Sequence, residues 1–165
     1  MVKWNGKKGM RIGINLQFLL PGVVGGTEIY ALSLLKTIAR IDHKNEYVIF
    51  LNRESAHIKL GDNPNFSPVV CNIRAIFRPV RYLWEQTILS IQAKLYHLDI
   101  LHSLGYVSPL HLPCKSIVTV HDLNFHNLAQ YLSPIKRSTL RYFVTRSVQN
   151  ADHIITVSKF SKSQI

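Results

Sequence analysis

Short apolar runs alternate with amphipathic helical segments along most of this chain. Runs that predict strands cover residues 10–16, 46–51, 69–73, 100–102, 115–120 and 153–157. Segments that predict helices lie between or after them, at residues 30–41, 83–97, 133–150 and 159–165. Continuous apolar runs are typical of strands covered on both faces, and their alternation with helices indicates βαβ units. We therefore expect an α/β fold built on a doubly wound parallel sheet.

Apolar side chains at helical spacing mark the helix faces that we expect to pack on this sheet. In the first helical segment they are Tyr30, Leu34, Leu35, Ile38 and Ile41. In the second they are Ile88, Ile91 or Leu95, and Leu98. The polar stretch from residue 53 to residue 68 is predicted to be a surface loop.

The length of 165 residues allows one domain with a hydrophobic core. Residues 1–9 are basic and lack the apolar core of a signal peptide, so we interpret them as a leader and residues 10–165 as the domain. Cys71 and Cys114 have no closely spaced partner, which favours reduced thiols and a cytoplasmic protein. The net charge of +11 favours an anionic partner; because the bases are dispersed and lack an RNA-binding motif, we predict no nucleic acid.

The sequence Gly25-Gly26-Thr27-Glu28 joins the first predicted strand to the first helix. A helix N-terminus exposes unpaired N–H groups and the positive end of the helix dipole, and glycines let a phosphate approach that backbone closely. The spacing matches neither the dinucleotide fingerprint nor the Walker loop. Taken alone, such a sequence more often marks a glycine turn in which Thr27 or a neighbour caps the helix.

Polar residues follow several other predicted strands, at the ends where ligands bind in parallel sheets. They are His102, Ser103, His121, Asp122 and Ser158, of which Ser158 could also cap the last helix. The His121 imidazole could contact a sugar hydroxyl or be held by local hydrogen bonds at the start of a loop. A metal site built from His102, His121, Asp122 and His126 finds no support in helical histidine spacing or thiolates, so we predict no metal.

Two other enzyme classes lack their motifs in this sequence. A serine hydrolase of the α/β type would carry a Gly-x-Ser-x-Gly elbow, and Ser103 does not lie in one. A dehydrogenase would carry the fingerprint glycines and a ribose-binding acid after the second strand, and both are missing.

Four motifs follow one another along the chain. They occupy residues 25–28 (Gly-Gly-Thr-Glu), 99–103 (Asp-Ile-Leu-His-Ser), 118–122 (Val-Thr-Val-His-Asp) and 151–161 (Ala-Asp-His-Ile-Ile-Thr-Val-Ser-Lys-Phe-Ser). In this order they resemble the N-terminal domain of retaining nucleotide-sugar glycosyltransferases of the GT-B fold, in which two Rossmann-like domains face each other. The resemblance is to the family 4 enzymes, which include mannosyl- and glucosyltransferases, and it covers the chain from Met10 to its last residue.

This resemblance implies transfer of a hexosyl group from a nucleotide sugar to a hydroxyl acceptor, such as a cell-surface polysaccharide or a glycolipid, without a cofactor. It also implies that Gly25, Gly26 and Thr27 lie over the donor diphosphate. A carboxylate next to a phosphate is repelled, so Glu28 either contacts acceptor hydroxyls or caps the helix start.

The resemblance assigns roles to the remaining strand-end residues as well. His121 would contact the transferred sugar or stabilise the transition state, and Asp122 would hold the loop that positions it. Ser158 would lie on the floor of the cleft near the hinge. His102 and Ser103 belong to the same expected substrate-binding set.

In this family the C-terminal domain supplies the basic residues that clamp the diphosphate and a pair of glutamates for ribose and sugar. We find none of these motifs in residues 1–165, so we expect a truncated N-terminal half that is inactive alone. Two alternatives are a non-catalytic Rossmann-like binding module and a half-enzyme completed by a separate chain.

Residues 74–84 interleave three arginines with aromatic and aliphatic residues, and Lys136, Arg137, Arg141 and Arg146 add a basic helix face. Such a mixture suits an anionic membrane surface, which would make the protein peripheral to the inner face of the cell membrane. The alternative is a solvated face in which Leu83 and Trp84 belong to the core.

Overall fold

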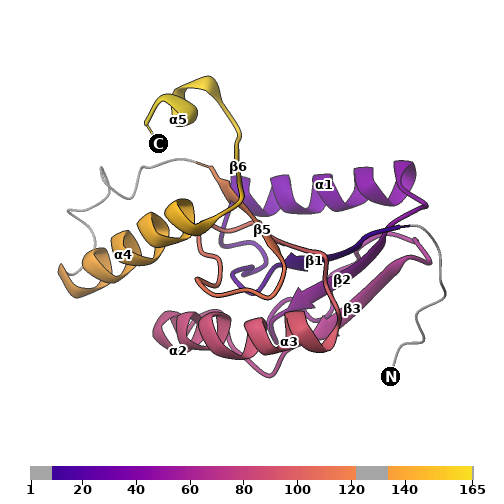
Figure 1. Ribbon diagram of the computed structural model, residues 1–165, viewed down its shortest axis with the longest axis horizontal. Coiled ribbons are helices and arrows are strands. Elements are labelled where there is room, and N and C mark those ends of the chain that lie inside the picture. Colours follow the sequence, from indigo (N-terminus) through magenta and orange to yellow (C-terminus); the bar gives the residue numbers. More distant parts are fainter. Residues whose placement is uncertain (1–8, 122–133, 165) are drawn as a thin grey trace.

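The computed structural model describes residues 9–121 and 134–164. Nearly all of the predicted leader lies outside these residues, and so do Asp122, His126 and Ser133. Six parallel strands form one sheet in the order β3-β2-β1-β4-β5-β6, which confirms the doubly wound parallel fold (Figure 1). The strands are β1 (Arg11–Asn15), β2 (Glu46–Leu51), β3 (Phe66–Val70), β4 (Ile100–Ser103), β5 (Lys115–Val120) and β6 (His153–Thr156).

Helices cover the two faces of this sheet. They are α1 (Gly26–Ile41), α2 (Arg78–Trp84), the π-helical turn η1 (Glu85–Leu89), α3 (Ser90–Leu95), α4 (Pro134–Asn150) and α5 (Lys159–Gln164). Helix α1 lies on one side of the sheet, and α2, α3 and α4 lie on the other (Figure 1). None of the helices in the described part of the chain is long and apolar enough to cross a membrane.

Each face of the sheet has its own apolar core. Under α1 the core contains Ile14, Leu16, Ala31, Leu35, Ile49 and Leu51. Under α2 and α3 it contains Val48, Phe50, Leu89, Ala93, Leu98 and Leu101. Alternate residues of one strand thus serve opposite faces, as the pleat of a β-strand requires.

The predicted face of α1 is correct except at its last member. Ala31 and Leu35 are fully buried, and Tyr30, Leu34 and Ile38 pack around them, but Ile41 is 71% exposed. Ile41 is the final residue of the helix, where the chain turns away to β2.

The predicted third strand begins too late. β3 starts at Phe66 and includes Pro68, which the turn signals had assigned to a loop. Because β3 pairs only with β2, the ring nitrogen of Pro68 can face outward without removing a hydrogen bond from the sheet.

The helix after β3 begins at Arg78, five residues before the predicted start, and contains one widened turn. α2 passes through η1 into α3 without a break. A regular α-helix turns about 100° per residue, so positions four residues apart drift by about 40° at each step. A π-helical turn takes up more residues and offsets this drift. Arg81, Glu85, Leu89 and Ala93 therefore line the sheet side at intervals of four.

The same turn makes part of the predicted apolar face of this helix wrong, although Leu98, its last member, is buried as predicted. Ile91 and Leu95, expected to be buried as alternatives, are 54% and 69% exposed, whereas Leu89 and Ala93 are fully buried. The prediction assumed regular helical spacing through residues 85–89, and the π-helical turn changes that spacing.

Gly13 of β1 lies where the core allows no side chain. A Cβ atom there would come within 2.5 Å of Leu98 Cδ1 and 2.9 Å of Leu101 Cδ1. We predict that Gly13→Ala lowers the free energy of unfolding by about 1–3 kcal/mol through overpacking, as measured by urea denaturation. A Gly13→Ala protein as stable as the natural one would contradict this close packing.

Candidate functional site

The carboxyl ends of the strands lie along one edge of the sheet, and the strand order reverses there between β1 and β4. Asn15 and Ser103, the last residues of these two strands, are in register. The chain leaving β1 runs to α1 on one face, while the chain leaving β4 adds Leu112 and Cys114 to the other. In folds of this type such a reversal is the usual place for a ligand.

The glycine pair at this edge is open to its surroundings. Gly25 is the N-cap of α1 with φ 57° and ψ −126°, and neither Thr27 nor any other side chain in the described part of the chain caps the helix. A Cβ atom on Gly25 or Gly26 would meet no atom of residues 9–121 and 134–164 within 4 Å, chain neighbours apart. A ligand can therefore approach the first N–H groups of a 16-residue helix, whose dipole favours an anion.

Glu28 braces the loop that leads to this helix. Its half-buried carboxylate accepts a hydrogen bond of 2.8 Å from the backbone N–H of Gly22. Gly22 itself has φ 75°, so the chain reverses sharply at this point. One oxygen of Glu28 thus holds the chain six residues upstream, which is a structural task at the helix start.

A buried asparagine after β2 holds the same loop from the other side. The Nδ2 group of Asn52 donates to the carbonyls of Gln17 at 2.9 Å and Leu19 at 2.7 Å. Ser55 in turn donates its N–H to Asn52 Oδ1 at 2.8 Å. The predicted surface loop that begins at residue 53 is therefore anchored at its start, and Asn52 was not among the predicted site residues.

His121 follows β5 directly and is 8% exposed. Its Nε2 lies 2.9 Å from the carbonyl of Leu104, and because a carbonyl only accepts, Nε2 carries the proton. The rings of Tyr30 and Tyr106 stand edge-on to the imidazole, with centroids at 4.9 Å and 5.6 Å. Tyr30 lies one turn beyond Gly26 on α1, so this contact brings the end of β5 to the first turns of that helix.

Ser158 is linked to His121 through a residue that the site prediction missed. The N–H of Ser161 donates to Ser158 Oγ at 3.0 Å, which makes Ser158 the predicted cap of α5. Ser161 Oγ donates to the carbonyl of His121 at 2.8 Å and lies 2.9 Å from Ser158 Oγ. The Ser-x-x-Ser spacing of residues 158 and 161 was the available signal, but the contact with His121 spans 40 residues.

His102 and Ser103 are consecutive and therefore serve opposite faces of the sheet. His102 Nε2 lies 2.8 Å from Thr119 Oγ1 on the α1 side, and burial lowers the pKa of this imidazole from 6.5 to about 4. Ser103 is fully buried, and no group of the described residues hydrogen-bonds to its hydroxyl. Neither side chain lies on the open surface with Gly25 and Gly26.

A second group of polar side chains is buried on the α2 side of this edge. Glu85 is 1% exposed, and burial raises the pKa of its carboxyl, an effect that Arg81 opposes. The Arg81 guanidinium Nε lies 3.7 Å from Glu85 Oε1. A π-helical turn often marks a functional site, and here it places an acid under the strand reversal.

The family model of Glycosyltransferase Family 4 matches residues 24–165, which is most of the chain. The chain belongs to Glycosyltransferase Family 4. The match confirms the predicted glycosyltransferase domain in general, and no curated protein matches the sequence.

In this family 4 domain the predicted site residues that the structure describes divide into three groups. Gly25, Gly26, Thr27 and Glu28 share one loop, and His121 and Ser158 are joined to each other beside it. His102 and Ser103 lie beneath the surface of the sheet edge. Asp122 lies outside the described residues.

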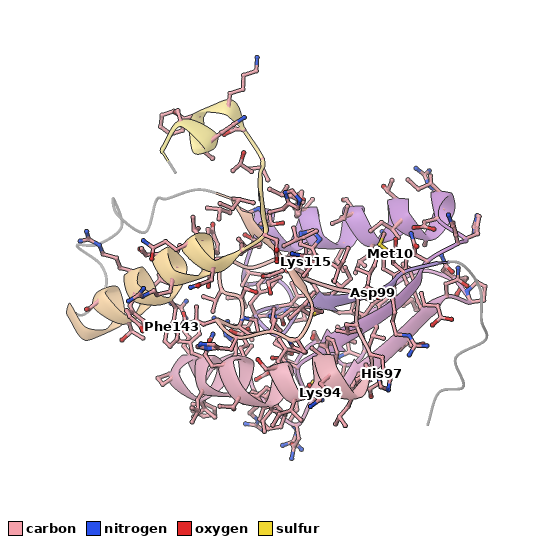
Figure 2. The ribbon with its side chains drawn as sticks, in the orientation of Figure 1. Met10, Lys94, His97, Asp99, Lys115 and Phe143 are labelled. Atoms are coloured by element: carbon pink, nitrogen blue, oxygen red, sulfur yellow. The ribbon has the colours of Figure 1, made fainter. Side chains whose placement is uncertain are left out.

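One other feature of the described residues lies apart from this edge. A shallow hollow of about 480 Å³ lies at the amino end of β4 and β5, where Asp99 and Lys115 are neighbours (Figure 2). We place no site there, because it is at the opposite edge from the glycine loop. No group of three histidine, cysteine or acidic residues lies close enough to hold a metal ion in residues 9–121 and 134–164.

The backbone at Gly25 suits only glycine, whereas that at Gly26 does not have positive φ. We predict that Gly25→Ala lowers the free energy of unfolding by about 1–3 kcal/mol through backbone strain. Gly26→Ala is the matched control, since a Cβ atom at position 26 is equally free of contacts. The Gly26→Ala protein should be as stable as the natural protein or slightly more stable. Equal losses in both variants by urea denaturation would contradict the strained cap.

The buried imidazole of His102 makes the free energy of unfolding depend on pH. The folded protein holds its imidazole neutral down to a pKa of about 4, whereas the unfolded chain takes up a proton near pH 6.5. Above pH 6.5 the neutral His102 costs the folded protein nothing. As the pH falls from 6.5 towards 4, the free energy of unfolding therefore decreases by about 2–3 kcal/mol because of this group. We predict that denaturation curves of His102→Gln lack this part of the decline; parallel pH profiles for both proteins would contradict it.

Proposed function

We propose that this chain is the acceptor-side domain of a transferase that moves a hexosyl group from a nucleotide sugar to a hydroxyl acceptor of the polysaccharide or glycolipid type. The observation that carries the proposal is the contact between His121 and Tyr30, one helical turn from the open Gly26. This contact brings an imidazole close to an open helix N-terminus, which supports a diphosphate site at that terminus. Family membership makes a glycosyl donor the natural ligand for this pair.

The proposed reaction breaks the bond between the sugar C1 and the diphosphate oxygen and joins C1 to the acceptor oxygen, whose proton is released. Negative charge grows on the departing diphosphate, so backbone N–H groups at Gly26 and Thr27 would stabilise the transition state more than the bound donor. Retention of configuration is proposed from the family resemblance.

His121 would meet the transferred sugar in this scheme. Its ring orientation is fixed by the Leu104 carbonyl and by two tyrosine rings before any substrate binds. We assign Asp122 to holding the loop that follows and Ser158 to holding the backbone of His121 through Ser161. Glu28 already binds the Gly22 N–H, which favours its role at the helix start over a contact with the acceptor.

We also propose that the donor clamp lies on a second Rossmann-like domain, as the family resemblance implies, so that residues 1–165 alone do not turn over the donor. That domain could belong to the same polypeptide or to a separate chain. No cofactor is needed, since the donor carries its own leaving group. Both described cysteines are free, which supports a reducing compartment such as the cytoplasm.

The test of this function uses two variants whose fold should be unaffected. Gly26→Val fills open space above the helix N-terminus, and Thr37→Val places the same side chain at an exposed position further along α1. We predict that saturation-transfer NMR with UDP-glucose and GDP-mannose detects binding of at least one donor, and that Gly26→Val loses it while Thr37→Val keeps it. Donor binding that survives Gly26→Val would place the diphosphate elsewhere.

Turnover is measured with labelled donors and a lipid extract as acceptor, for residues 1–165 alone and joined to a second domain. We expect turnover only in the joined protein and a fall of about 10²–10³-fold in kcat for His121→Ala. Turnover by residues 1–165 alone would overturn the half-site proposal, and an unchanged kcat would remove His121 from the reaction.

A further inference from the structure

The helix formed by α2, η1 and α3 carries an exposed apolar stripe on the side away from the sheet. We call it the outer stripe; its members are Ile76 and Phe77 in the preceding turn and Val80, Leu83, Ile91 and Leu95 on the helix. Each of these side chains is 54–69% exposed. Six exposed apolar side chains, four on one helix and two in the turn before it, are more than scattered surface residues produce.

The outer stripe runs straight along the helix for the same reason as the buried residues Arg81, Glu85, Leu89 and Ala93 on the opposite side. Leu83, Thr87, Ile91 and Leu95 follow one another at intervals of four, and the π-helical turn between them offsets the drift of a regular helix. The core under this helix is completed by Leu89 and Ala93 on the opposite side. The stripe is therefore not needed for packing within the domain.

The exposed charges on the helix and turn that form the outer stripe are positive, while the half-buried Glu54 carboxylate contacts the same turn, where it accepts a hydrogen bond of 3.0 Å from the Ala75 N–H. Within residues 66–98, all of which the structure describes, Glu85 is the only acid, and it is 1% exposed. Arg74, Arg78 and Lys94 are exposed, with Lys94 on α3, on the far side of the sheet from α1 (Figure 2). Of the three arginines in residues 74–84, only Arg81 points inward.

Helix α4 extends this positive surface. It packs beside α2 through Phe143 and Tyr82, whose rings are 5.1 Å apart (Figure 2). Arg141 and Arg146 are exposed on α4. Two neighbouring helices of the same layer therefore present bases to the solvent.

We propose that the outer stripe is a membrane-binding surface, with the helix lying flat in the headgroup region of an anionic lipid bilayer. Residues 78–95 would extend about 27 Å along the bilayer surface. Apolar side chains that enter the interface between basic residues bind anionic lipids through both burial and charge. The proposal does not depend on the transferase function.

A protein partner fits this surface less well. Two copies joined face to face through the outer stripe would bring Arg74, Arg78 and Lys94 of each copy together with no exposed acid from residues 66–98. Anionic headgroups supply the missing charge along the whole length of the helix.

The experiment is co-sedimentation with vesicles of phosphatidylcholine alone or mixed with phosphatidylglycerol. Leu83→Gln/Ile91→Gln removes apolar surface without adding charge, and Arg74→Gln/Arg78→Gln removes charge. The matched control is Ile29→Gln/Ile41→Gln, which changes side chains that are 69% and 71% exposed on α1, across the sheet. We expect the natural protein to bind the mixed vesicles. Binding should be roughly tenfold weaker for Leu83→Gln/Ile91→Gln and for Arg74→Gln/Arg78→Gln, the two stripe variants, and unchanged for the control.

Three outcomes would overturn the proposal. One is equal binding to both kinds of vesicle, since charge would then have no part. Another is equal loss in the stripe and control variants. The third is self-association, seen by light scattering, that Leu83→Gln/Ile91→Gln abolishes while vesicles bind nothing, because the stripe would then serve a second copy of the chain. All variants are compared by thermal unfolding, and weaker binding by a variant that melts like the natural protein supports the proposal.

Discussion

The position of β1 between β2 and β4 determines the rest of this domain. Because β1 pairs in parallel with β2 on one side and with β4 on the other, the strand order reverses at this strand. Gly13 lets Leu98 and Leu101 close against the middle of that strand. The glycine loop and the end of β5 then meet at one edge, since Tyr30 on α1 reaches across to His121.

The alternation of apolar runs and helices was enough to predict the sheet and most of its strands. Hydrophobic periodicity works for β1, β2 and β5 because their burial on both faces leaves little choice of residue. It fails where backbone geometry departs from the regular period. Pro68 is tolerated in the edge strand β3 because its ring nitrogen can face away from the sheet. The π-helical turn η1 changes the helical period within a segment where the prediction assumed a constant period.

The places of the candidate residues were predictable where they follow from the end of a strand or helix, and not where they depend on distant hydrogen bonds. The glycine pair, His121 and Ser158 all stand at strand or helix ends and could be identified from the sequence. Asn52 and Ser161 could not, because their partners lie 35 and 40 residues away and polar contacts leave no periodic pattern. The inward position of His102 likewise depends on Thr119 in the neighbouring strand.

The hydrogen bond from Ser161 to the carbonyl of His121 has a mechanical consequence. Helix α5 is short, and Phe160 within it is 69% exposed, so few apolar contacts hold it to the sheet. A shift of α5 must either break this hydrogen bond or pull the peptide plane after His121 with it. The imidazole, clasped between two tyrosines, would then tilt relative to the start of α1. Movement of α5 is thereby transmitted to the edge of the sheet where the glycine loop lies.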